Sequence, residues 1–257
     1  MNEASILERL EKDILVLTIN RPSRMNALSE SVRIGLTGAL EAAARRDDVA
    51  GVVLTGAGPR AFSAGQDLDE AQAFSAETIG GHFRRLGRLY DAIRSLPKPV
   101  GVALNGVAAG FGLQASLYAD IRVAHAGVTM SQPEVRAGIP SVMGLWVIAE
   151  NIGLPRAVDL SLTCRAVPAE ELLRWNAIDA IVAPEDVLGE TVARVRALAA
   201  KPKKAFAASK MNLARLTQAG FEETIEAAVR IQGEAFRTGE PQAVAAAFMA
   251  AREARKR

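Results

Sequence analysis

Residues 99–114 constrain the fold more than any other part of the chain, because they combine an apolar run with closely spaced glycines. The run is typical of a buried strand, and Asn105-Gly106 and Gly110-Phe111-Gly112 then interrupt it. Residues 113–117 are compatible with a helix. The pattern predicts a strand, a loose turn and the first turn of a helix, where backbone N–H groups are unpaired and partly positive. Small residues at 108–110 would admit an oxygen atom close to these donors, as an oxyanion hole requires.

A second apolar run that ends in glycines offers the other half of such a hole. It is Val52-Val-Leu-Thr-Gly-Ala-Gly58, and Ala61-Phe-Ser-Ala-Gly-Gln-Asp-Leu68 follows it. Ile19-Asn-Arg-Pro22 and Asn26-Ala-Leu28 precede both. In this order the segments resemble the crotonase superfamily, also called the enoyl-CoA hydratase/isomerase family. The resemblance is collinear over residues 14–182, with a weaker echo at Ala247-Phe248.

Composition limits the remaining classes of protein. Apolar residues make up 49% of the 257 residues and charged residues 23%, which is ordinary for a globular chain with a sizeable core. A net charge of +2 favours neither nucleic acid nor a membrane surface as a partner. The single cysteine, Cys164, fits a reducing compartment. With no signal peptide or membrane-spanning run in the sequence, we expect a cytoplasmic protein.

The order of predicted elements indicates the fold class. Strand-like runs at 14–19, 52–55, 100–104 and 119–124 alternate with helical patterns at 32–43 and 77–93, which is typical of an α/β fold with parallel strands. The resemblance implies a crotonase-like spiral of ββα units with a helical C-terminal trimerisation region. We therefore assign residues 1–184 to an α/β core with an acyl-CoA site. Residues 185–257 are expected to pack in an oligomer, a homotrimer or a dimer of trimers, and to cap the active site.

Three positions acquire a chemical role from the resemblance. The N–H groups of Gln66 and Phe111 would hold a thioester carbonyl between them, although Gly65 and Gly110 alone would equally suit ordinary tight turns. Glu134, in Gln132-Pro133-Glu134, matches the family's catalytic glutamate. It lies in a mostly apolar stretch, where a carboxylate can have a raised pKa and act as an acid or base near neutrality. An exposed glutamate, or one paired with Arg136, is the simpler alternative.

The sequence departs from the hydratase pattern at Gln114, where hydratases carry a second glutamate. An amide can form hydrogen bonds but cannot transfer a proton at neutral pH. Moving a double bond needs a single base, which removes a proton from C2 and returns it at C4. The chemistry therefore favours an isomerase that uses Glu134, with a slow enoyl-CoA hydratase as the alternative. A catalytically weak acyl-CoA-binding subunit is the alternative from another class.

Coenzyme A is the carrier that the resemblance implies, as part of the substrate and not as a permanently bound cofactor. The residues that match the family's contacts with it are Ser23, Arg24, Met25, Ala64, Asp67, Leu68 and Gly110. Arg252 and Arg255-Lys-Arg257 are candidates for phosphate contacts, with a solvated terminus as the default interpretation.

Other candidate residues have simpler explanations. We expect a surface or capping role for His82, although some relatives place a histidine near the acyl pocket. Tyr118 and Trp146 fit an acyl tunnel and core packing equally well. Arg84, Arg85, Arg88 and Arg94 are expected to form a solvated helix face.

Rival α/β enzymes and metal sites find little support. The glycine spacing is not that of a dinucleotide-binding loop, and Ala61-Phe-Ser63-Ala-Gly65 lacks the first glycine of a nucleophile elbow. The two histidines and the cysteine have no ligand-like spacing, so we predict no metal site.

Overall fold

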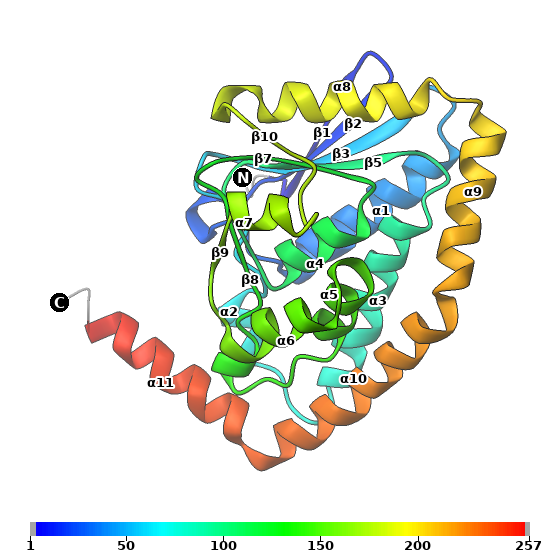
Figure 1. Cartoon of the computed structure of the whole chain (residues 1–257). Coiled ribbons are helices and arrows are strands. Elements are labelled where there is room, and N and C mark those ends of the chain that lie inside the picture. The colour runs from blue at the N-terminus through cyan, green and yellow to red at the C-terminus, as the bar shows by residue number, and fades with distance from the viewer. Residues whose placement is uncertain (1–3, 255–257) are drawn as a thin grey trace.

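A computed structural model describes residues 4–254, which form two sheets surrounded by helices (Figure 1). The larger sheet has the strand order β1-β2-β3-β5-β7-β10, and its pairings are parallel except for the β1–β2 hairpin. Its strands are β1 (Ile6–Glu11), β2 (Ile14–Ile19), β3 (Gly51–Gly56), β5 (Val100–Leu104), β7 (Ile121–His125) and β10 (Ala180–Val182). The runs predicted at 14–19, 52–55 and 100–104 are central strands of this sheet.

The larger sheet is buried on both faces, which explains why its strands are nearly continuous apolar runs. Along β2, Ile14 and Val16 pack with helix α8 (Val187–Ala199) on one face, while Leu15 and Leu17 belong to the main core on the other. Helices α1 (Glu30–Arg45) and α3 (Ile79–Arg94) contribute to that main core. Ser29 caps the start of helix α1, because its hydroxyl accepts the Val32 N–H.

A smaller sheet, which the sequence only partly predicts, lies beside the first. It consists of β4 (Ala61–Ser63), β6 (Val107–Ala109), β8 (Thr129–Ser131) and β9 (Val167–Pro168), in that order. Residues 99–114 therefore contain two strands, β5 and β6, before helix α4 (Phe111–Tyr118). The chain repeatedly forms one strand in each sheet and then a helical segment. The order β3-β4 is followed by the short helix α2 (Leu68–Ala71) and α3, and β5-β6 is followed by α4, as in a spiral of ββα units. The crotonase-like fold class is confirmed.

Helices dominate the chain after residue 141. They are α5 (Met143–Ile152), α6 (Leu154–Thr163), α7 (Ala169–Arg174), α9 (Lys203–Leu216), α10 (Gln218–Thr238) and α11 (Glu240–Ala254). Figure 1 shows α9 and α10 running along one side of the body, while α11 projects away from it. Within residues 4–254, no helix is both long and apolar enough to cross a bilayer.

The expectation of a solvated arginine face on α3 is wrong for Arg94, although Arg84, Arg85 and Arg88 are exposed. The buried Arg94 guanidinium donates to the Ala214 carbonyl, to Thr217 at 2.6 Å and to Gln218 at 2.7 Å. It also lies 4.5 Å from the centre of the Phe221 ring. These groups come from the junction of α9 and α10, so Arg94 anchors both helices to α3.

Candidate active site

A cavity of about 360 Å³ lies between the loop after β4, helix α3, the start of α4 and the start of α11. The smaller sheet positions it, because β4 and β6 pair side by side and deliver the two glycine loops to the same place. Seven of the predicted site residues border the cavity: Ala64, Gln66, Leu68, Gly110, Phe111, Gln114 and Glu134. Ser23, Arg24, Met25 and Asp67 lie outside this lining.

The loops that carry Gln66 and Phe111 approach each other through glycine. A Cβ at Gly65, where φ is +94°, would lie 3.0 Å from the Ala109 carbonyl oxygen. Gly110, with φ of +49°, occupies the N-cap position of α4, so Phe111 begins the helix with a free N–H. A side chain at Gly65 would therefore press on the Ala109 backbone, and a side chain at either glycine would be strained by the positive φ.

A short bridge orients the Gln66 amide. Leu28 donates to the Gly65 carbonyl at 2.7 Å, and Asp67 donates to the Leu28 carbonyl at 3.1 Å. Successive N–H groups of an extended chain point to opposite sides, so the Gln66 N–H points away from Leu28. Within the described residues, neither this amide nor that of Phe111 donates a hydrogen bond to a protein group. Two such donors at one cavity can stabilise a negatively charged oxygen.

Glu134 precedes the short 3₁₀ helix η2 (Val135–Ala137) and borders the same cavity. Burial raises the pKa of its carboxyl group, and hydrogen bonds with Ser141, Gln132 and Gln114 oppose that rise. A carboxylate with a raised pKa is suited to exchange protons near neutral pH. The alternative of an ion pair between Glu134 and Arg136 is wrong, because the Arg136 guanidinium donates instead to the Cys164 carbonyl.

Gln114 links Glu134 to a residue that the sequence analysis overlooked, Tyr90. The Gln114 amide donates to Glu134 Oε1 at 2.9 Å and to Gln132 Oε1 at 3.3 Å. The Tyr90 hydroxyl donates to Gln114 Oε1 at 2.7 Å. Tyr90 is fully buried and its pKa is raised well above the ordinary value, mainly by burial, so it keeps its proton. The amide is thereby held with its NH₂ group toward Glu134.

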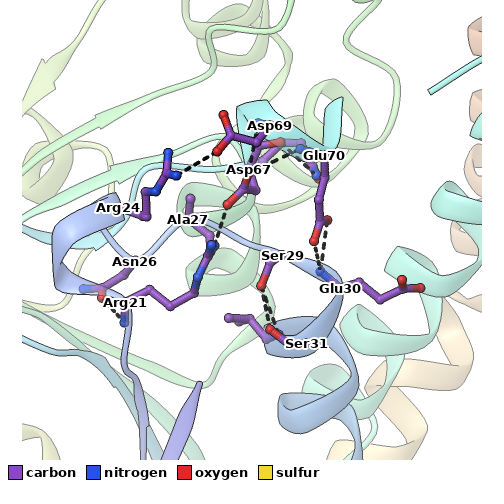
Figure 2. Close-up of polar contacts among 12 residues, drawn as sticks. Arg21, Arg24, Asn26, Ala27, Ser29, Glu30, Ser31, Asp67, Asp69 and Glu70 are labelled. Carbon is purple, nitrogen blue, oxygen red and sulfur yellow. Dashed lines mark hydrogen bonds and ion pairs between the residues drawn. The ribbon is translucent and has the colours of Figure 1, made fainter. Parts of the chain in front are cut away.

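An ion pair between Arg21 and Asp67 fixes the loop that follows Gln66 (Figure 2). Arg21 Nη1 lies 2.6 Å from Asp67, whose other oxygen accepts the N–H groups of Asp69 and Glu70 at the start of α2 (Leu68–Ala71). Burial would raise the pKa of Asp67, but Arg21 and these amides lower it overall. Asp67 is therefore ionised and fixes the loop that carries the Gln66 amide.

The segment proposed to contact the nucleotide lies against this loop. Ser23 and Arg24 belong to the 3₁₀ helix η1 (Pro22–Arg24), and the Met25 carbonyl accepts the Ala64 N–H at 2.9 Å. Arg24 is half-exposed and pairs with Asp69 at 2.9 Å (Figure 2). The other phosphate candidates, the Arg252 side chain and residues 255–257, lie outside the described part of the chain.

Of the three aromatic candidates, only His82 borders the cavity, whereas Tyr118 and Trp146 pack in the core. The expected surface role of His82 is wrong, because its side chain is buried and borders the cavity. Tyr118 and Trp146 do not border it. Both pack against Phe221, with ring centres 5.9 and 6.0 Å away, so core packing explains them.

Comparison with known proteins identifies the family. The family model described as enoyl-CoA hydratase/isomerase matches residues 9–256. This chain belongs to that family, the crotonase superfamily. Among its curated relatives, "Probable enoyl-CoA hydratase EchA17" of Mycobacterium tuberculosis is 35% identical over 88% of this chain and 87% of its own length. The "1,2-epoxyphenylacetyl-CoA isomerase" of Escherichia coli is 34% identical over 77% of each chain.

Solved structures agree with this assignment. An enoyl-CoA hydratase from Mycobacterium avium subsp. paratuberculosis superposes with a TM-score of 0.85 and 26% identity over 96% of this chain and 99% of its own. Members of the enoyl-CoA hydratase/isomerase family act on CoA thioesters, which fits a cavity with paired amides and a partly buried carboxylate. The relatives carry both hydratase and isomerase names.

Proposed function

We propose that this family member is an enoyl-CoA isomerase in which Glu134 is the only proton-transfer group. The Gln66 and Phe111 amides bind the thioester carbonyl oxygen. Glu134 removes a proton from C2 of a 3-enoyl-CoA, and the resulting dienolate carries its negative charge on that oxygen. The same carboxyl returns the proton at C4, so the double bond moves from C3–C4 to C2–C3 and no atom is gained or lost.

The observation that carries this proposal is the hydrogen bond from Gln114 to Glu134. It places an amide where a second acid would be needed to share the activation of water and the protonation of carbon. Tyr90 and Gln114 keep their protons at neutral pH, and Glu134 is the only carboxylate that borders the cavity among the described residues. A positioned acid or base contributes roughly 10²–10⁴ in rate, so hydration by Glu134 alone is slow.

The substrate's coenzyme A portion lies, in this proposal, along the loop formed by residues 64–68 and the η1 segment. Ala64 and Leu68 flank the Gln66 amide, and Gly110 gives the thioester close access to the Phe111 amide. Ser23, Arg24 and Met25 contact the nucleotide end. Asp67 does not contact the substrate in this proposal, and it fixes the position of the loop through its ion pair with Arg21.

The C-terminal helices have a further role in the proposal. The start of α11 borders the cavity through Pro241 and Val244, so the region from residue 185 onward helps to cap the site. On α6, Leu154, Val158 and Leu162 form an exposed apolar stripe at helical spacing. Such a surface supports assembly into a homotrimer or a dimer of trimers, which light scattering of the purified protein would test.

A hydratase is the second candidate, and the hydratase name of the Mycobacterium tuberculosis relative favours it. Parallel assays decide between the two reactions. One supplies a 3-enoyl-CoA and follows appearance of the conjugated thioester, and the other supplies a 2-enoyl-CoA and follows addition of water by mass. We expect faster isomerisation. Faster hydration would make the protein a hydratase, and binding without either reaction would make it an acyl-CoA-binding subunit.

A further inference from the structure

His82 is a polar side chain set in an apolar part of the cavity wall. It lies on α3 with 4% of its surface exposed, and Ile79, Phe83 and Leu86 of the same helix also line the cavity. The Phe74 ring centre lies 4.6 Å from the imidazole centre and that of Phe83 lies 5.2 Å away. The proposed isomerisation assigns no role to this histidine.

A buried arginine behind the ring determines which nitrogen carries the proton. Nη1 of Arg33, on α1, lies 3.4 Å from His82 Nδ1. A guanidinium can only donate, so Nδ1 must be the accepting nitrogen and the N–H must be on Nε2. Arg33 itself is 3% exposed.

The charges around His82 keep the ring neutral. Burial, Arg33 and Arg85 all lower its pKa, to about 3. The carboxylates of Glu30 and Glu70 act on Arg33, and that of Glu30 lies 3.6 Å from Arg33 and 3.7 Å from Arg85. A neutral imidazole with this pKa cannot act as a base near pH 7, which excludes a proton-accepting role. It can donate one hydrogen bond.

The donor end of the ring has no protein partner. Within the described residues, Nε2 forms no hydrogen bond. Nε2 is also not fully enclosed by protein, so another molecule can reach it. The unpaired Nε2 is therefore accessible, and it belongs to a side chain that borders the cavity. Arg33 Nε is also buried without a partner, so this arrangement is not optimised for stability. An unpaired donor held in an apolar wall is typical of a site that recognises an oxygen.

We propose that His82 determines substrate specificity by donating its Nε2–H to an oxygen on the acyl chain, beyond the reacting double bond. The preferred substrates are then CoA thioesters whose acyl group carries a carbonyl or carboxylate oxygen. Arg33 and Arg85 make the donor stronger and favour an acceptor with negative charge. This proposal rests on the proposed function, because it requires the acyl chain to occupy this cavity.

Calorimetric binding of octanoyl-CoA and of its 5-oxo, 6-oxo and 7-oxo derivatives tests the preference. The wild-type protein is expected to bind at least one oxo ester roughly fivefold to tenfold more tightly than octanoyl-CoA. His82→Phe should remove this difference and leave octanoyl-CoA binding unchanged or tighter. The matched control is His125→Phe, at the other histidine of the chain, and it should retain the preference.

The outcomes separate this proposal from the one on which it rests. Equal binding of all four esters, or a preference that survives His82→Phe, would overturn the role of His82 and leave the isomerase proposal intact. If the wild-type protein binds none of the four CoA esters, both the role of His82 and the isomerase proposal are overturned.

Nitrogen-15 NMR provides a test that does not depend on binding. In His125→Gln protein, His82 is the only histidine, and its spectrum should show the Nε2–H form with no protonation between pH 8 and pH 5. Arg33→Met should raise its pKa. An Nδ1–H form, or ordinary titration near pH 6.5 with Arg33 in place, would contradict the proposed geometry.

Discussion

Gln114 Nε2 lies 2.9 Å from Glu134 Oε1 and donates a hydrogen bond to it, which places an uncharged partner beside the one carboxylate that borders the cavity in the described part of the chain. Tyr90 fixes the amide from the other side, at 2.7 Å. Because Gln114 offers its NH₂ group, the hydrogen bond is stronger when Glu134 is ionised than when its carboxyl group is protonated. The contact with Gln114 therefore favours the ionised form of Glu134 and opposes the rise in its pKa that burial causes.

Replacing Gln114 by glutamate should introduce hydratase activity. Two carboxyl groups at this separation share a proton, because like charges oppose double ionisation, and the pair can then activate water and protonate carbon together. We expect Gln114→Glu to raise the rate of water addition to a 2-enoyl-CoA by roughly 10²-fold.

The matched control for this change is Gln114→Met, which has similar length but no acid, and it should show no gain in hydration. If Gln114→Glu hydrates no faster than this control, then the missing acid is not what limits hydration.

Glu134→Gln should abolish isomerisation while preserving binding of the CoA ester. The substitution keeps size and hydrogen-bonding capacity but removes the base, so kcat should fall by roughly 10²–10⁴. Calorimetry with a saturated acyl-CoA should give an unchanged Kd, because the Gln66 and Phe111 amides are unaffected. Glu223→Gln, at an exposed position of α10, serves as the control and should behave as wild type. Full activity of Glu134→Gln would remove this residue from the mechanism.

The long buried strands could be predicted from the sequence, but the smaller sheet largely could not. Strands β2, β3 and β5 are apolar runs of five or six residues with β-branched members, a strong signal for a sheet buried on both faces. Strands β4 and β6 have three residues each, too few to show a period. Their pairing brings Gly65 and Gly110 together. The two glycine-rich segments were visible in the sequence as candidate halves of an oxyanion hole, but the specific donors Gln66 and Phe111 came only from family resemblance.

The polar contacts of the site were equally hidden. Tyr90 looked like one apolar member of the α3 pattern, because its hydroxyl reaches a residue 24 positions away. Arg94 was expected to be exposed to solvent because its partners are also distant in the sequence. The carbonyl and hydroxyl groups that receive its guanidinium lie more than 100 positions further along the chain and leave no local signal.

The pH dependence of the reaction should report Glu134. The group acts as a base, so kcat/KM should fall as pH decreases through its pKa, which burial raises above the ordinary value of 4.5. Gln114→Met removes one hydrogen bond that lowers this pKa, so the inflection should move to higher pH in that variant. Rate profiles of both proteins check this. An inflection in Gln114→Met at or below that of wild type would contradict the assigned contact.

His82 should make the protein sensitive to acid. Its folded-state pKa is about 3 against an ordinary 6.5, so between these values the unfolded chain binds the additional proton. Stability is then fully present above pH 6.5 and is lost as pH falls, at up to about 1.4 kcal/mol per pH unit. Urea unfolding at pH 7 and pH 5 should show a smaller loss for His82→Phe than for wild type. Equal losses would mean that His82 is not buried in its neutral form.

The position of deuterium in the product tests single-base isomerisation most directly. A 3-enoyl-CoA is incubated with the enzyme in deuterated water, and the product is examined by mass spectrometry and NMR. Transfer of a proton by Glu134 predicts a 2-enoyl-CoA without added water, carrying any solvent deuterium at C4, and no such product with Glu134→Gln. A product that contains the elements of water, or C4 deuteration that persists in Glu134→Gln, would contradict it.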